Sequence, residues 1–165
     1  MNFEELIEKV KHIPYGRNSN RNDFSLVLKE NKGTCSSKHA FLKEYADENN
    51  IENVKLFIGV FKMNEINTPK IAPLLSNNAI DYIPEAHCYL KIDGNVIDVT
   101  SENLFYENIK NDILEEIEIE PIQVVDWKIN YHKEFINNWL DNSIESKTFN
   151  DIWAIREQCI SKLAE

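Results

Sequence analysis

The first fifty residues carry apolar side chains at the spacing of amphipathic helices. The first such set is Phe3, Leu6, Ile7 and Val10. Their intervals of three and four residues predict a helix over the first dozen positions. A polar run with proline and glycine at 14–23 then predicts a loop, and 24–30 fits a short helix or an extended piece. A second helix is expected from Thr34, its N-cap, to about residue 50.

The middle of the chain changes to patterns that favour strands. Residues 54–61 are nearly all apolar and β-branched or aromatic, which predicts a strand buried on both faces. The connection at 63–85 contains three prolines and is long enough to predict a wall or lid of a functional site. A hairpin is predicted at 87–100. A further strand is predicted at 117–127, with Pro121 at a sheet edge or a bulge.

Two amphipathic helices are predicted to close the chain, at 130–142 and 148–165. Helices first, strands in the middle and helices last indicate an α+β fold in which N-terminal helices pack on a central antiparallel sheet. No repeat or linker divides the sequence, so we expect one domain over residues 1–165. A chain of this length buries roughly two-thirds of its unfolded surface and needs no disulfide or metal for stability.

The predicted hairpin fixes which side chains share a face. Asp93-Gly94 favours a two-residue type I′ turn, because both central positions of that turn need positive φ. The pairs that follow are Ile92 with Asn95, Leu90 with Ile97, and Cys88 with Val99. This face is apolar and should pack on the core. The other face then holds His87 and Asp98 as diagonal neighbours, about 7–8 Å apart at the backbone.

Cys35 begins the helix that Thr34 caps. The dipole and free N–H groups of a helix start lower the pKa of a thiol, and activated cysteines reach roughly 3.5–7.5. An imidazole beside the sulfur strengthens this effect, and a carboxylate orients the imidazole. Cys35, His87 and Asp98 are therefore the candidate nucleophile, base and orienting acid. The N–H groups at the helix start could also stabilise an oxyanion.

Composition and charge limit the partners and the cellular location that we expect for this protein. The 165 residues have a formal net charge of -10, which argues against a general nucleic-acid or anionic-membrane surface. The three cysteines cannot all pair and show no CxxC spacing, so a reduced, cytoplasmic setting is expected. The N-terminus carries acids where a signal peptide has positive charge, and no segment has the roughly 20 apolar residues of a membrane span.

Two stretches carry a family resemblance: "GTCSSKHAFLKEYADENN" and "AHCYLKIDGNVIDVT". They resemble the transglutaminase-like branch of the papain-like cysteine enzymes, over roughly residues 14–100. In that family a Cys opens a helix, a His begins a strand, and an Asp follows on the next strand, often in a D-P-T context. Here Cys35, His87 and Asp98 match, with "DVT" in place of "DPT".

The resemblance implies a papain-like α+β fold and cysteine chemistry on amides, without choosing among proteolysis, deglycosylation, deamidation and acyl transfer. It implies no metal or organic cofactor, and a peptide, a protein or a small amide as substrate. Acyl transfer from a thioester cofactor would use the same three residues in the same roles. Such domains can lose activity, so the alternative is a non-catalytic protein- or peptide-binding module with this fold. The Asn-, Lys- and Ile-rich composition is typical of a bacterial protein.

Several residues compete with these assignments. His39 lies one turn from Cys35 on the same helix face, but no nearby residue is expected to orient it. Asp93 is explained by the turn itself. A zinc site from Cys35, His39, His87 and Cys88 is disfavoured, because His87 and Cys88 should point to opposite faces of a strand.

The remaining assignments concern substrate contacts and packing. The residues upstream of the nucleophile that could contact substrate or an oxyanion are Tyr15, Arg17 and Asn22. Cys88, Cys159 and the three tryptophans fit core positions.

Overall fold

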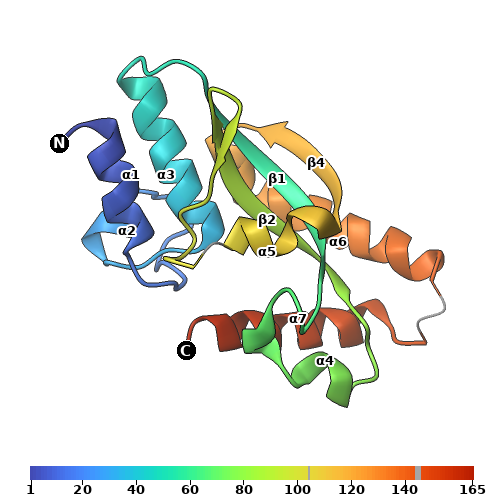
Figure 1. The fold of residues 1–165 in the computed structure, drawn as a ribbon. Helices are drawn as coiled ribbons and strands as arrows, with labels where there is room; N and C mark the ends of the chain where they lie inside the picture. The colour runs from blue at the N-terminus through green and yellow to red at the C-terminus, as the bar shows by residue number, and fades with distance from the viewer. Residues whose placement is uncertain (104, 144–145) are drawn as a thin grey trace.

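The computed structural model describes residues 1–103, 105–143 and 146–165. Its centre is a four-stranded antiparallel sheet with strand order β3-β2-β1-β4 (Figure 1). The strands are β1 Val54–Met63, β2 Ile83–Ile92, β3 Asn95–Ile97 and β4 Ile113–Ile119. The protein is thus α+β with an antiparallel sheet, as the order of sequence patterns predicts.

Helices precede, interrupt and follow the strands. In the described residues they are α1 Phe3–Lys11, α2 Leu26–Lys29, α3 Cys35–Glu48, α4 Leu74–Asn77, α5 Phe105–Ile109, α6 Asp126–Asp141 and α7 Phe149–Leu163. The two long helices at the end of the chain are those predicted, although α6 begins four residues earlier than the pattern indicated. In the described residues, no helix is both long and apolar enough to cross a membrane.

The β2–β3 hairpin turns at Asp93-Gly94, as predicted. Asp93 and Gly94 both have positive φ, 49° and 82°, and Leu90 pairs with Ile97. The predicted pair of Cys88 with Val99 is wrong, because β3 ends at Ile97. The N–H of Val99 instead donates to the His39 ring at 2.9 Å. Within the described chain, β2 therefore has no partner on this side between Ile83 and Tyr89.

The last strand differs from its prediction in its bounds. β4 ends at Ile119, so Pro121 is not a strand residue; it opens a 3₁₀ turn at Pro121–Val124. Proline has no N–H for a ladder and fits the first turn of a helix. β4 lies at the edge of the sheet beside β1, and the pairing shifts register between Val60 and Phe61.

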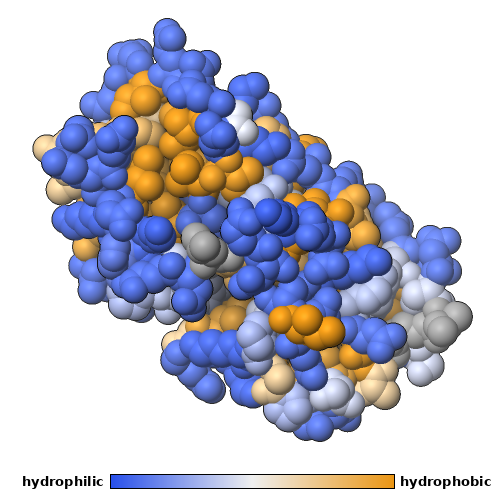
Figure 2. Space-filling model, in the orientation of Figure 1, coloured by the Kyte–Doolittle hydropathy of each residue, from blue (hydrophilic) through white to orange (hydrophobic). Residues whose placement is uncertain are grey.

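Two hydrophobic clusters form the core. The first joins α1 and α3 to one face of the sheet, through residues such as Leu42, Ile58 and Leu90. The second joins the ends of β1 and β2 to α4, α6 and α7, through residues such as Met63 and Ile152. Figure 2 shows the surface hollowed between the part built by α1–α3 and the part built by α4 and α7.

Candidate active site

Cys35 is the first residue of α3, and a capping box fixes the start of this helix. The Thr34 hydroxyl accepts the N–H of Ser37 at 3.3 Å, and the Ser37 hydroxyl accepts the N–H of Thr34 at 2.9 Å. The cap leaves the N–H groups of Cys35 and Ser36 with no acceptor in the described part of the chain. The sulfur thus lies beside unpaired donors at a helix N-terminus, where an anion is stabilised.

The surroundings of Cys35 favour its thiolate. Its side chain is buried, with 9% of the residue exposed. A hydrogen bond from Cys88 lowers the pKa of the Cys35 thiol most, and the charges of Lys128 and His87 lower it further. Burial opposes these effects, but the pKa of Cys35 lies well below its ordinary value. These contacts favour the charged form of the sulfur over the neutral thiol.

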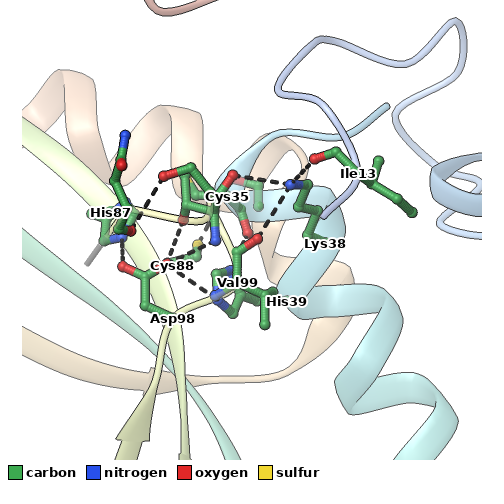
Figure 3. Close-up of polar contacts among 12 residues, drawn as sticks. Ile13, Cys35, Lys38, His39, His87, Cys88, Asp98 and Val99 are labelled. Atoms are coloured by element: carbon green, nitrogen blue, oxygen red, sulfur yellow. Dashed lines mark hydrogen bonds and ion pairs between the residues drawn. The ribbon is translucent and has the colours of Figure 1, made fainter. Parts of the chain in front are cut away.

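His87 lies between the thiol and a carboxylate. Its Nε2 lies 2.7 Å from Asp98 Oδ2, and its hydrogen bond to Cys35 is among the causes that raise its pKa (Figure 3). Burial disfavours a charged ring, but the charge and hydrogen bond of Asp98 overcome this and raise the pKa of His87 to about 10. The charged forms of Cys35 and His87 therefore favour each other, and Asp98 holds the ring.

Asp98 is fixed from several directions. Its Oδ1 accepts the N–H of Thr100 at 2.9 Å and the Thr100 hydroxyl at 2.5 Å. Burial raises the pKa of the Asp98 carboxyl, but the charge of His87 and these hydrogen bonds hold it well below its ordinary value. The Thr of the "DVT" triplet thus holds the carboxylate toward His87.

His39 is oriented by the backbone, contrary to the expectation that no nearby residue orients it. Its Nε2 accepts the N–H of Val99 at 2.9 Å, so its Nδ1 donates to the Cys35 carbonyl at 2.6 Å. Burial lowers the pKa of His39 and keeps the ring neutral. Because both nitrogens bind backbone groups, His39 cannot act as the base for Cys35, and it fastens the Asp98 segment to α3.

Lys38 also ties separate segments to α3. Its ammonium donates to the carbonyls of Val99 and Thr100 at 3.2 and 2.9 Å and to that of Ile13 (Figure 3). Burial lowers the pKa of Lys38 to about 8. Gly33 lies against this side chain, because a Cβ there would lie 2.8 Å from Lys38 Cγ. This close approach explains the glycine of the "GTC" motif.

Lys128 completes the surroundings of the sulfur from α6. Its Nζ lies 3.8 Å from Cys35 Sγ and donates to the Ser36 hydroxyl at 2.7 Å. The residue is 8% exposed, and burial disfavours its charge. The negative charge of Cys35 nevertheless raises the pKa of Lys128 above its ordinary value. Sequence reasoning missed both Lys38 and Lys128; the only available signal was a lysine on the apolar face of an amphipathic helix.

The imidazole is also packed against aromatic rings. The ring centroid of Phe105 lies 4.6 Å from that of His87, and those of Tyr89 and Phe61 lie 6.1 and 6.3 Å away. These contacts exclude water from the His87 side and leave the ring few orientations. The His87 ring is therefore held in place by side chains of β1, β2 and α5.

Two cavities meet at Cys35. The first, of about 320 Å³, extends toward α6 and α7 and includes Arg17, Lys128 and Arg156. The second, of about 560 Å³, extends past His87 to residues 67–70 of the long connection after β1, which therefore forms a wall of the site. The residues common to both are Tyr15, Cys35, Glu85 and Ile160. A substrate could lie on both sides of the sulfur.

The predicted substrate residues separate into two groups. Tyr15 lies beside the nucleophile, because Gly16 N–H donates to Gly33 O at 3.2 Å just before the α3 cap. Burial and the negative charge of Cys35 raise the pKa of Tyr15, so its hydroxyl keeps its proton. Arg17 lines the first cavity. Asn22 is exposed and lines neither cavity, so the structure gives it no place at the site.

The described residues contain no group of three or more His, Cys, Asp or Glu side chains placed to hold a metal ion. Cys88 and Cys159 are buried in the core, as predicted, although Cys88 also contacts the candidate nucleophile.

Searches against family models, curated proteins and solved structures found no match.

Proposed function

We propose that the protein is a cysteine hydrolase or acyltransferase that acts on amide bonds through Cys35, His87 and Asp98. The observation that carries this proposal is the position of Cys35 at the N-terminus of α3 beside His87, whose Nε2 lies 2.7 Å from Asp98 Oδ2. A structural cysteine has no need of this arrangement, because burial alone raises a thiol pKa. A papain-like, transglutaminase-like architecture is part of the same proposal, since the Cys helix and the His–Asp hairpin meet as that family requires.

The geometry supports a two-step mechanism. The Cys35 thiolate attacks the amide carbon, and the backbone N–H groups at the start of α3 stabilise the resulting oxyanion. His87 gives its proton to the departing amine while Asp98 holds the ring. A thioester remains on Cys35. Water then releases the acid in a hydrolase, or a second amine takes the acyl group in a transferase, and His87 removes the proton of either nucleophile.

The substrate is a peptide, a protein or a small amide that fits the two cavities on either side of the sulfur. The chemistry needs no metal or organic cofactor, and nucleic acids and membranes are not proposed as partners. Three free cysteines fit the proposed cytoplasmic location.

Thiol reactivity tests the proposal directly. We expect iodoacetamide to label Cys35 stoichiometrically below pH 7, because the lowered pKa maintains the thiolate there. His87→Ala should reduce the labelling rate at least about tenfold at this pH, since one pKa unit is a factor of ten. Peptide mass spectrometry would separate Cys35 from the two buried cysteines, and Cys35→Ser is the control.

The second candidate is a non-catalytic binding module that keeps the fold and the triad. The 9% exposure of Cys35 favours it, because a buried sulfur accepts substrate only where a cavity reaches it. Labelling of Cys35 no faster than that of a free thiol, unaffected by His87→Ala, would support the module and contradict the enzyme.

A further inference from the structure

The first cavity concentrates positive charge in a protein whose formal net charge is -10. Its cationic lining residues are Arg17, Arg21, Lys128, Lys133 and Arg156, and its carboxylates are Glu85 and Glu157. His132 also lines it, but burial lowers the pKa of this ring and keeps it neutral. An excess of cations around a cavity that reaches a candidate nucleophile attracts anions.

The two carboxylates are already paired. Arg156 donates two hydrogen bonds to the Glu85 carboxylate, of 2.9 and 2.7 Å. Glu157 accepts from Arg156 at 2.8 Å and from Arg17 at 3.0 Å. These four side chains compensate one another and leave the other three cations of the cavity without an acidic partner.

Those three cations have no carboxylate within ion-pair distance in the described part of the chain. Arg21 is exposed at the cavity. Lys133 lies over the Trp153 ring at 5.1 Å, and Lys128 donates to the Ser36 hydroxyl. Lys128 matters most because it is buried, and a buried charge without a counter-ion is costly.

The excess of positive charge in this cavity increases when the proposed reaction forms a thioester on Cys35. The Cys35 sulfur lies 3.8 Å from the Lys128 ammonium. The charge of Glu85 also acts on Lys128, but that carboxylate is paired with Arg156. When Cys35 becomes a neutral thioester, Lys128 loses the sulfur as a charged partner. An acyl group that brings its own negative charge into this cavity would restore the balance.

We infer that the first cavity is a subsite for an anionic group on the acyl part of the substrate, such as a carboxylate. The inference rests on the proposed function and specifies its substrate class: amides whose acyl side is acidic. Asn18 adds a second contact, since its amide nitrogen donates to Lys32 O and Glu30 while its buried Oδ1 accepts no hydrogen bond within the described chain. A substrate N–H could donate to this oxygen.

Three methanethiosulfonate reagents of different charge test the inference. The thiolate sulfur bonds to the sulfenyl sulfur of each reagent, the S–SO₂ bond breaks, and methanesulfinate leaves with the electron pair. The anionic sulfonatoethyl reagent should modify Cys35 at least about tenfold faster than the cationic trimethylammonioethyl reagent, given the uncompensated charges. The neutral methyl reagent measures activation of the thiol alone.

Variants that each remove a positive charge show which cavity causes the preference for the anionic reagent. Arg21→Ala should reduce the anion-to-cation rate ratio about threefold, and Arg21→Ala with Lys133→Ala about tenfold, as expected for partly screened charges. Lys70→Ala removes the same charge from the second cavity and should leave the ratio unchanged. The rate of each variant with the neutral reagent is measured alongside and corrects the ratio for any change in the thiol itself.

Two results would overturn the inference while leaving the proposed function intact. One is a fast, His87-dependent reaction with the neutral reagent but no preference for the anionic one. The other is an equal effect of Arg21→Ala and Lys70→Ala, which would indicate the general field of the protein. A slow reaction of Cys35 with the neutral reagent would instead reject the proposed function, and this subsite with it.

Discussion

Lys128 places its ammonium 3.8 Å from the Cys35 sulfur although it comes from a helix more than ninety positions further along the chain. A unit charge at about 4 Å from another contributes about 4 kcal/mol at the effective dielectric of a protein. This energy favours the thiolate form and raises the fraction of reactive sulfur. Lys128 on α6 therefore acts together with His87 on β2 to favour the charged form of the Cys35 sulfur.

Lys128→Met should raise the pKa of Cys35, because it removes a positive charge and retains most of the apolar volume. We expect the midpoint of the labelling rate against pH to rise by at least about one unit, and the rate below that midpoint to fall about tenfold for each unit. The measurement is the labelling rate against pH, whose midpoint should move upward. Lys9→Met removes an equal charge from the exposed face of α1 and is the control. An unchanged midpoint in Lys128→Met would show that Lys128 does not act on the sulfur.

The position of Cys35 at a helix start and the closeness of His87 and Asp98 could be predicted from the sequence, because each depends on a local signal. Thr34 caps a helix at Cys35, and a two-residue turn at Asp93-Gly94 sets His87 and Asp98 on one side. Lys128 could not be predicted, since its role depends on how α6 packs against α3. No local spacing encodes that packing. Asn22 was assigned from its position in the chain alone, and that reasoning failed.

At the scale of elements, α3 holds the whole site together. Its first turn presents Cys35, and its next residues bind the segment that follows β3. Lys38 donates to two carbonyls of that segment, and His39 accepts its Val99 N–H. The hairpin predicts that His87 and Asp98 are close, but α3 determines where β3 ends. The sequence pattern could not predict this end, because helix and hairpin compete for the same N–H group.

Lys38→Met should destabilise the protein, because three backbone carbonyls lose a charged donor inside the fold. Hydrogen bonds from charged groups contribute about 1.5–3 kcal/mol each, so we expect the free energy of unfolding in urea to fall by at least about 3 kcal/mol. The amide protons of Val99 and Thr100 should also exchange faster in the variant. Lys43→Met is the control on the same helix; Lys43 pairs with Asp47 near the surface and should cost less than about 1 kcal/mol. Equal losses in the two variants would contradict this role of Lys38.

At the scale of the whole molecule, the site lies between the two halves of the core. Cys35 belongs to the first hydrophobic cluster, and Phe61, beside His87, belongs to the second. The C-terminal helices α6 and α7 supply Lys128, His132 and Arg156 to the first cavity. Their sequence pattern predicted covering helices only. A periodic apolar stripe shows which face a helix buries, but it does not show which polar residues beside the stripe face a cavity.

The Cys35–His87 pair also links the site to the stability of the entire chain. His87 has a pKa of about 10 in the fold against an ordinary 6.5, and Cys35 has a pKa well below its ordinary 9.0. With Cys35 as the proposed thiolate, the folded pair holds one proton between pH 6.5 and 9.0, on the imidazole, and the unfolded chain also holds one, on the thiol. Folding then moves no net proton, and the pair adds no pH dependence to stability in this window.

Cys35→Ser should change this behaviour. The variant lacks the thiol, so His87, with its pKa still raised by Asp98, holds a proton in the fold that the unfolded chain loses above pH 6.5. A group whose pKa is raised on folding stabilises the fold fully at a pH below its pKa in the unfolded chain. This stabilisation is lost as the pH rises toward its pKa in the fold. The variant should therefore lose up to about 1.4 kcal/mol per pH unit relative to the natural protein between about pH 6.5 and 9.

Urea unfolding of both proteins across this pH range measures the difference, and the subtraction removes the contributions of groups that titrate alike in both. If Cys35 instead kept its proton in the fold, the stabilisation from the charged His87 would decrease with pH in both proteins. The difference between their free energies of unfolding would then stay constant. A constant difference would thus contradict the thiolate–imidazolium pair without any assay of activity. A difference that grows with pH requires a charged sulfur in the folded protein, which is the state that a nucleophile needs.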